Sequence, residues 1–125
     1  MGVMTLRKAL MRTSFAALIM IGLAACQTTA ADPADRLTAD QVRGTFVDRE
    51  WTQGNGTFMF SKDGTYRYDD SRMSARGTWQ IADDGVLCTV NSGSGVRTCY
   101  TFYRDGDGYR YWHDRSGRYW PAKLR

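Results

Sequence analysis

Two of the three cysteines are spaced for a covalent cross-link between neighbouring strands. Cys88 and Cys99 lie eleven residues apart, on either side of a Ser92–Gly95 turn. If Asn91 pairs with Val96 in a hairpin, the two cysteines face each other with Cβ atoms about 4.5–5.5 Å apart. A disulfide needs roughly 3.5–4.5 Å, so a modest adjustment suffices. We predict a Cys88–Cys99 disulfide. The alternative is a metal or redox pair, but neither cysteine has another cysteine or a histidine close to it in the sequence.

The only histidine, His113, is the first residue to consider for acid–base chemistry. It stands in the sequence Tyr-Trp-His-Asp at the end of an expected strand, where the adjacent Asp114 faces the other way. The chain has no G-x-S-x-G nucleophile motif. We interpret His113 as a rim or turn residue and expect the protein not to be an enzyme. Three or more convergent polar groups around His113 in a concave site would favour an enzyme instead.

The acidic residues are not spaced for a metal site or for a paired general acid and base. Glu50 is the only glutamate, and most aspartates lie in turns, where local backbone geometry favours them. The sequence Asp105-Gly-Asp107-Gly is similar to the start of a calcium loop, but Tyr109 stands where the next oxygen ligand belongs. We therefore expect a hairpin turn there, and neither a metal ion nor a cofactor in the protein.

Arginine is interleaved with aromatic residues in the last third of the chain. Such a segment could recognise a carboxylate, a phosphate or a glycan through bidentate and stacking contacts. The alternative is that these arginines lie on the outer face of a barrel and pair with aspartates across strands. The candidate binding patch consists of Ser94, Gly95, Arg97, Arg104, Arg110, Trp112 and Trp120.

The pattern after Gly44 predicts an all-β fold. Short runs rich in Thr, Tyr, Phe, Trp and Val alternate with Gly-containing turns, and no stretch between them fits an amphipathic helix. One short helical turn, Leu37–Arg43, precedes them with Thr38 as its cap. We expect a small antiparallel meander of about eight strands that closes into a barrel, because exposed edges are a hazard. The expected strands are Thr45–Glu50, Thr57–Phe60, Thr65–Asp69, Ala75–Ile81, Val86–Val90, Val96–Arg104, Tyr109–His113 and Arg118–Lys123.

Alternation with a period of two selects the core of this barrel. Large apolar residues two positions apart share a face of their strand. Tyr103, Trp112 and Trp120 do not fit this pattern and are expected to cap the barrel ends or form a surface patch. The expected core is Phe46, Phe58, Phe60, Tyr66, Tyr68, Trp79, Ile81, Leu87, Tyr100, Phe102, Tyr109 and Tyr111.

The N-terminal segment has the pattern of a targeting signal rather than of a folded domain. An apolar run, Ser14–Ala25, is too short to span a membrane and follows three basic residues, Arg7, Lys8 and Arg12. It ends in Leu-Ala-Ala-Cys26, which resembles the lipobox of bacterial lipoproteins. The resemblance implies cleavage before Cys26 and a membrane anchor through acyl chains on Cys26. The alternative is a soluble secreted protein cleaved near the same point.

This resemblance sets the expected organisation and location. It implies a signal peptide (residues 1–25), a lipidated flexible tether (residues 26–36) and a single β-barrel-like domain (residues 37–125). Gln27 after the cysteine, where Asp would favour inner-membrane retention, implies the periplasmic face of the outer membrane. The oxidising periplasm also favours the predicted disulfide. The net charge of +4 comes largely from the basic residues of the expected signal peptide. Nucleic acid is therefore not an expected partner of a protein in the envelope.

The chain from Leu37 onward resembles a group of small, uncharacterised secreted proteins and lipoproteins of alphaproteobacteria. The shared pattern is L-x-A-D-x-V-R, then D-G-T-Y, then G-T-W-x-I-x-D-D-G-x-L-C, and finally C-Y. These motifs stand here at residues 37–43, 63–66, 77–88 and 99–100. The resemblance implies a barrel with a disulfide, and it carries no activity.

A weaker resemblance is to membrane-bound lysozyme inhibitors, small β-barrel lipoproteins with a disulfide. It depends on Ser94-Gly95, Tyr103, Asp105-Gly106, Tyr111-Trp112 and the end of the chain, Gly117 and Ala122-Lys-Leu124. The spacing differs, because Tyr103 is too far from Gly95. We expect a non-enzymatic binding or structural module of the envelope, with an envelope protein or a hydrolase as partner. The alternative is an inhibitor of lysozyme or of another secreted hydrolase, which predicts that Ser92–Gly95 protrudes beside arginine and aromatic side chains.

Overall fold

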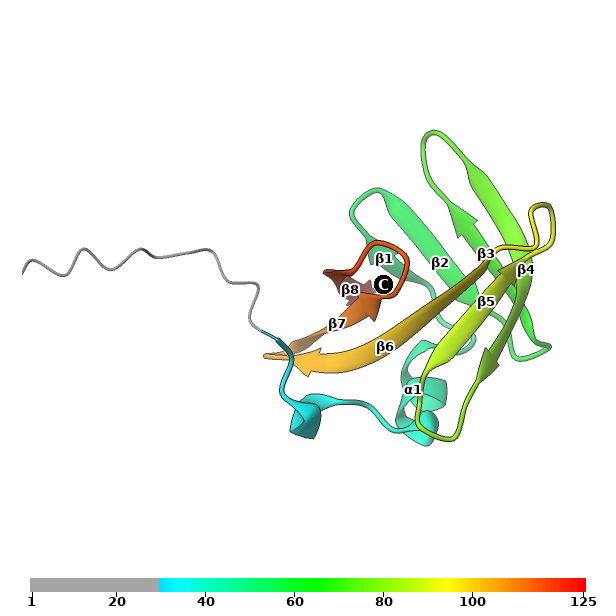
Figure 1. Cartoon of the computed structure of the whole chain (residues 1–125). Helices are drawn as coiled ribbons and strands as arrows, with labels where there is room; N and C mark the ends of the chain where they lie inside the picture. The colour runs from blue at the N-terminus through cyan, green and yellow to red at the C-terminus, as the bar shows by residue number, and fades with distance from the viewer. Residues whose placement is uncertain (1–29) are drawn as a thin grey trace, which may run out of the picture.

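The computed structural model describes residues 30–125, which form a closed barrel of eight antiparallel strands. Each strand pairs with the next along the chain, and β8 pairs with β1 to complete the ring (Figure 1). This confirms the expected all-β meander and its closure. The strands are β1 (Trp51–Gln53), β2 (Gly56–Phe60), β3 (Thr65–Asp69), β4 (Ser74–Ile81), β5 (Leu87–Asn91), β6 (Arg97–Asp105), β7 (Gly108–His113) and β8 (Arg118–Leu124).

Seven of the expected strands are present within one residue of their expected bounds, but the first one, Thr45–Glu50, is wrong. The expected helical turn is instead the longer helix α1 (Ala39–Phe46), and the barrel begins only at Trp51. The weak strand preference of a single residue is overridden where another conformation gains more free energy from tertiary packing. Here the helical conformation brings Phe46, fully buried, into the barrel interior.

The start of α1 is fixed by the cap expected from the sequence. The hydroxyl of Thr38 accepts the backbone N–H of Gln41, and the side chain of Gln41 accepts the backbone N–H of Thr38. This reciprocal capping box satisfies two backbone donors that the helix leaves free. A single turn of 3-10 helix, η1 (Pro33–Asp35), precedes it along the chain.

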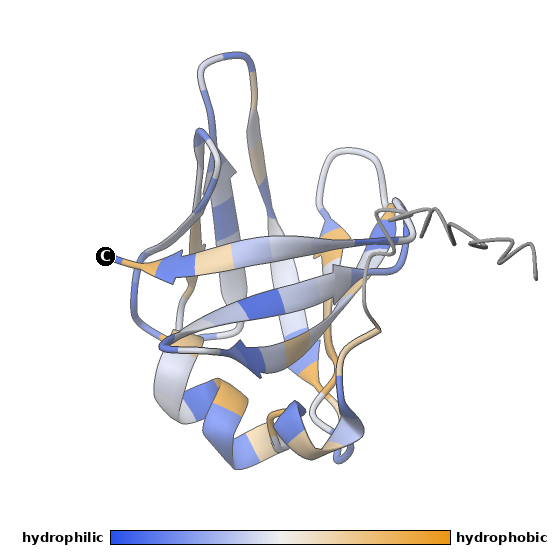
Figure 2. Cartoon of the chain, turned by 90° about the vertical axis from the view of Figure 1, so that its left-hand side faces the viewer, coloured by the Kyte–Doolittle hydropathy of each residue, from blue (hydrophilic) through white to orange (hydrophobic). Residues whose placement is uncertain are grey.

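α1 lies across one end of the barrel and closes it (Figures 1 and 2). The backbone N–H of Leu37 donates to the carbonyl of Phe102 on β6 at 2.9 Å, and Asp48 N–H donates to the carbonyl of Phe60 on β2 at 2.7 Å. Arg36 and Asp84, in the β4–β5 turn, form an ion pair at 3.5 Å. The helix is therefore attached to strands on several sides of the barrel.

Aromatic rings fill the barrel interior next to α1. Phe46 stacks on Phe102 with ring centroids 4.2 Å apart, and Trp51 stacks on Phe58 at 4.1 Å. The expected core is largely confirmed, although Tyr68, Trp79, Ile81 and Tyr109 are only partly buried. Four further buried core residues were not expected from the sequence, namely Leu37, Val42, Trp51 and Ala122.

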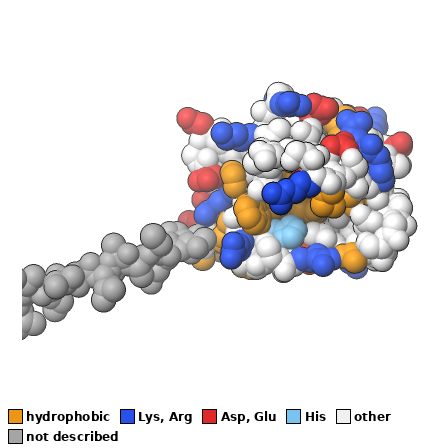
Figure 3. Space-filling model, turned by 90° about the horizontal axis from the view of Figure 1, so that it is seen from above, with side chains coloured by type: hydrophobic (Ala, Val, Ile, Leu, Met, Phe, Trp, Pro, Cys, Tyr) orange, Lys and Arg blue, Asp and Glu red, His pale blue; other side chains and the backbone are white. Residues whose placement is uncertain are grey.

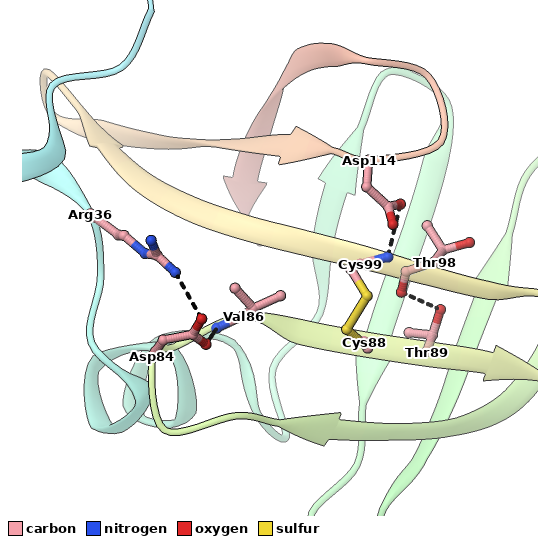
Figure 4. Close-up of a disulfide and its surroundings, with 8 residues drawn as sticks. All are labelled: Arg36, Asp84, Val86, Cys88, Thr89, Thr98, Cys99 and Asp114. Atoms are coloured by element: carbon pink, nitrogen blue, oxygen red, sulfur yellow. Dashed lines mark hydrogen bonds and ion pairs between the residues drawn. A yellow bond between two sulfur atoms is a disulfide. The ribbon is translucent and has the colours of Figure 1, made fainter.

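The expected disulfide is present on the outer wall of the barrel. Cys88 of β5 and Cys99 of β6 are directly paired in the register, with Cα atoms 4.1 Å apart (Figure 4). Leu87 and Thr89, on either side of Cys88, are buried, so the half-buried cysteine points outward. The cross-link therefore joins two strands without occupying the interior.

The expected N-terminal targeting segment lies outside the described residues. The signal peptide, the lipidation site Cys26 and the first part of the tether all fall within residues 1–29, so these assignments stay predictions. Within residues 30–125, no helix is long and apolar enough to cross a membrane.

We predict opposite effects of adding a methyl group at two glycines. A Cβ at Gly77 in β4 would collide with the carbonyl oxygen of Val90 and the ring of Tyr66, whereas one at Gly44 in α1 meets nothing within 4 Å. Gly77→Ala should lower the free energy of unfolding by about 1–3 kcal/mol. Gly44→Ala should raise it by about 0.5–1 kcal/mol. Urea unfolding measures both, and equal effects would contradict the packing described for β4.

The second prediction concerns the disulfide. Replacing both Cys88 and Cys99 by serine should lower the free energy of unfolding by about 2–3 kcal/mol, because the cross-link restricts the unfolded chain. The measurement is urea unfolding with and without a reducing agent. The reducing agent should shift the unfolding midpoint of the parent protein and leave that of the double variant unchanged. An unshifted parent midpoint under full reduction would show that the cross-link contributes nothing.

Candidate functional site

The end of the barrel opposite α1 is open and hollow. Connections between antiparallel neighbours alternate between the two ends, so the loops after β1, β3, β5 and β7 surround this mouth (Figure 1). A cavity of about 400 Å³ opens between them, which we call the cup. Seen from above, the only histidine lies among hydrophobic and basic side chains (Figure 3). Six aromatic residues line the cup: Phe58, Tyr66, Tyr68, Tyr100, Tyr111 and Trp120.

Tyrosine hydroxyls converge within the cup. Burial raises the pKa of Tyr100 to about 12, and burial together with the neighbouring Tyr100 and Tyr68 also raises the pKa of Tyr111. Burial and a hydrogen bond to Asp70 raise the pKa of Tyr68 to about 12. All three side chains are therefore neutral phenols at pH 7, able both to donate and to accept hydrogen bonds.

His113 is part of a short hydrogen-bonded cluster at the rim. The backbone N–H of Ser116 donates to His113 Nδ1 at 3.0 Å, so Nδ1 accepts and the neutral ring carries its proton on Nε2. Ser116 Oγ lies 2.8 Å from the same Nδ1 and accepts the indole N–H of Trp120 at 3.1 Å. Partial burial is the main cause that lowers the pKa of His113. The cluster fixes the β7–β8 turn and holds the Trp120 ring in place.

Local hydrogen bonds also hold the other two long loops of the rim. Asp70 accepts the hydroxyl of Tyr68 at 2.7 Å and two backbone N–H groups of the β3–β4 loop, and these bonds lower its pKa. In the β5–β6 loop, Asn91 Oδ1 accepts the N–H groups of Gly93 and Ser94. Both loops therefore have a defined conformation at the mouth.

The cup offers hydrogen-bonding groups and ring faces. Its polar side chains are amides, hydroxyls, His113 and Arg115, and no carboxylate is among the residues that line it within residues 30–125. Ser116 and His113 lie close enough for proton exchange, but Ser116 Oγ is engaged by Trp120 and Nδ1 by a backbone N–H. Across residues 30–125, no three metal-ligating side chains are grouped to hold an ion.

The structure distributes the candidate patch residues over several places. Ser94 and Trp120 line the cup, and Gly95 lies in the same loop as Ser94. Trp120 therefore lies on the inner side of β8, whereas Trp112 lies on the outer side of β7. Arg97 lies in a shallow groove on the outer wall, and Arg104 is exposed near the far end of β6.

Trp112 lines a second hollow on the outer wall, together with Tyr103 and Tyr119, and Arg110 lies beside it. The guanidinium of Arg110 lies over the ring of Tyr119 at 4.6 Å, and Trp112 meets Tyr119 edge-on at 4.9 Å. The Tyr119 hydroxyl accepts the backbone N–H of Ala31, so the N-terminal segment crosses this face. These two residues therefore do not face the cup.

Pairing of arginine with acidic residues is found on another part of the wall, where it involves Arg125 of the C-terminal segment and two arginines from outside that segment. Arg76 of β4 pairs with Asp69 of β3 at 3.6 Å, and Arg67 and Arg125 both pair with Glu50. All these side chains are partly exposed, so each pair contributes little to stability. None of the ion pairs found among residues 30–125 includes Arg97, Arg104 or Arg115.

The residues of the cup were not predicted as a group, although the sequence carries a signal for some of them. The alternation that pairs Tyr109 with Tyr111 extends to His113, and the one that pairs Tyr100 with Phe102 extends back to Thr98. Both His113 and Thr98 line the cup. Period-two alternation continued to the strand ends would have placed them on the inner face.

The fold and the cavity define a class of small antiparallel β-barrel with one plugged end and one open end. The chain matches the model of a protein family over residues 14–122 and belongs to it: DUF995, a family described as "Protein of unknown function". No curated protein and no solved structure matches the chain. The alphaproteobacterial lipoprotein group and the likeness to lysozyme inhibitors stay predictions.

We predict that the lowered pKa of His113 makes stability depend on pH. Below about pH 6.5 the unfolded chain takes up a proton on this side chain more readily than the folded protein does. The free energy of unfolding should therefore decrease as the pH falls from about 6.5 towards the pKa of the folded state, with no contribution above that range. His113→Gln should remove this component.

NMR titration of the His113 imidazole measures the pKa directly. A midpoint below that of a histidine in an unstructured peptide is expected. A midpoint at or above the peptide value would contradict the burial of His113 in the rim cluster.

Proposed function

We propose that the protein is a non-enzymatic binding module, anchored to the bacterial outer membrane through Cys26, whose cup receives a small ligand. The observation that carries this proposal is the cavity of about 400 Å³ at the open end of the barrel. An eight-stranded barrel has an interior just wide enough to be filled by side chains or to hold one small ligand. Here one half is filled by aromatic rings and the other is open to solvent.

The character of the cup lining supports binding rather than catalysis. Ligand pockets combine apolar and aromatic walls with a few fixed polar groups, in volumes of about 300–1,000 Å³. The cup has both, and its rim loops are held by Asp70, Asn91 and Ser116. Polar groups do converge around His113 in the cup, but its Nδ1 accepts the backbone N–H of Ser116 and the Ser116 hydroxyl accepts the Trp120 indole N–H, so both are engaged in holding the rim.

The anchor is supported by the order of basic segment, apolar run and lipobox before Cys26. Cys26→Ala should abolish incorporation of labelled palmitate and release the protein from the membrane fraction. The matched control is the Cys88→Ser and Cys99→Ser double variant, which should still be labelled. Labelling of Cys26→Ala at the parental level would rule out lipidation at this residue.

A second candidate function is inhibition of lysozyme or another secreted hydrolase. The observation that favours it is the β5–β6 loop: Ser94 and Gly95 are exposed at the mouth, and Ser94 lines the cup together with Arg115. Such a loop could enter the active site of a partner. Enzyme assays with purified protein test this, and unchanged lysozyme and protease rates at micromolar protein would exclude it.

The binding function is tested by filling the cup. Ala75 lies at the start of β4 and lines the cup, whereas Ala82 is exposed in the β4–β5 turn at the closed end. A small-molecule library is screened by NMR, with the indole N–H of Trp120 as reporter. We expect hits that shift this signal, and Ala75→Trp should weaken them by about tenfold or more, equivalent to about 1.4 kcal/mol.

Ala82→Trp adds the same side chain away from the cup and should leave the hits unchanged. Thermal unfolding shows whether each variant is folded. A screen without a hit at Trp120, or hits equally strong in Ala75→Trp, would overturn the proposal that the cup is the binding site.

A further inference from the structure

The chemistry of the cup restricts the class of ligand, on the condition that the cup is the binding site as proposed above. The first restriction is charge. Arg115, exposed at the rim, is the one charged side chain among the described residues that line the cup at neutral pH, and it is in none of the ion pairs of residues 30–125. Asp70 is engaged by the Tyr68 hydroxyl, and Asp114 by the backbone N–H of Cys99 on the outer wall (Figure 4). The cup therefore presents a free cationic group to an anion at its rim, whereas both nearby carboxylates are held by hydrogen bonds outside the described lining.

The second restriction is hydrogen bonding in the depth of the cup. The Tyr111 hydroxyl makes no hydrogen bond to another residue of the described part, and its surroundings include Tyr100 and Tyr68. A hydrocarbon ligand, such as an acyl chain, would cover this hydroxyl without a partner, which is unfavourable. A ligand with several hydroxyl groups can donate to and accept from these phenols.

The third restriction is the presence of fixed ring faces. Trp120 is oriented by its indole N–H bond to Ser116, and Tyr66, Tyr100 and Tyr111 are held by packing inside the barrel. A flat ligand with an apolar face packs against such rings by dispersion and loss of water contact. A pyranose ring meets this requirement together with the second one, because its C–H faces are apolar and its edge carries hydroxyls.

We propose that the cup binds a pyranose sugar carrying a carboxylate, with the ring against Trp120, hydroxyls towards Tyr111, and the carboxylate at Arg115. A cavity of about 400 Å³ is within the range of small-ligand pockets and has room for one or two sugar rings. Sources of such a ring include free sugar acids and the acidic glycans of a cell surface. The shared chemistry is the acidic pyranose.

Titration by NMR and calorimetry with four probes tests this proposal. The probes are glucuronate, glucose, cyclohexanecarboxylate, which keeps the charge without the hydroxyls, and choline as a cation. We expect glucuronate to bind most tightly, glucose more weakly, and the other two weakest. Methyl glucuronoside and a glucuronate-containing oligosaccharide then separate the free sugar from a glycan end.

Two variants have matched controls on the outer wall. Tyr111→Phe removes one hydroxyl and keeps the ring, and should weaken glucuronate about 3- to 10-fold, the effect of one hydrogen bond. Arg115→Gln should weaken glucuronate by a similar factor and leave glucose unchanged. Tyr103→Phe and Arg104→Gln make the same changes outside the cup and should alter neither.

The outcomes separate this inference from the proposed function. Cyclohexanecarboxylate or choline could bind more tightly than either sugar, with binding still weakened by Ala75→Trp. That result would overturn the sugar assignment and leave the cup as a binding site. Glucuronate binding that is insensitive to both Tyr111→Phe and Arg115→Gln would also overturn it. Failure of every probe and of the whole library at the Trp120 signal would overturn the binding function itself.

Discussion

The structure depends on a single requirement, that the interior of an eight-stranded barrel be filled at one end. Phe46 meets it by entering from α1 and stacking on Phe102, next to the stacked pair Trp51 and Phe58. These rings are buried there together with Phe60, Leu37, Leu87 and Val42. Burial of apolar surface is the main stabilising term for so small a domain. Because these side chains occupy only the half of the barrel next to α1, the tyrosines beyond them line a space that stays open.

Because side chains alternate along the strands, the inner and outer faces of the wall carry different groups. Inner positions supply first the packed rings and then, towards the mouth, hydroxyls and amides. Outer positions hold the disulfide between Cys88 and Cys99 and the ion pairs around Glu50. The cross-link can therefore stabilise β5 and β6 without reducing the cup. The loops at the mouth are held by their own side chains, so the shape of the cup does not depend on a partner.

Features that depend on local patterns could be predicted from the sequence. The Cys88–Cys99 pairing followed from the symmetry of one hairpin, and the strands from turn residues and alternation. The helical conformation of Thr45 and Phe46 was not predictable in this way, since their residue types favour a strand and only the closing of that end of the barrel explains a helix there. Trp51 was missed because β1 is too short to show alternation. The cup was missed because its walls come from strands far apart in the sequence.

The seam between β1 and β8, like the pair of β1 with β2, has few paired residues because β1 is only three residues long. Among the described residues, two pairs join these strands, Trp51 with Leu124 and Thr52 with Lys123, although β8 extends over seven residues. The first five residues of β8, which include Pro121, are paired on the β7 side alone. Strand pairs with few contacts open locally at a lower free energy than the whole domain. Since Gln53 and Trp120 lie at this seam and line the cup, the barrel has a sparsely paired side and a cross-linked side, and local opening of β1 would alter the mouth before it altered the disulfide-bonded wall.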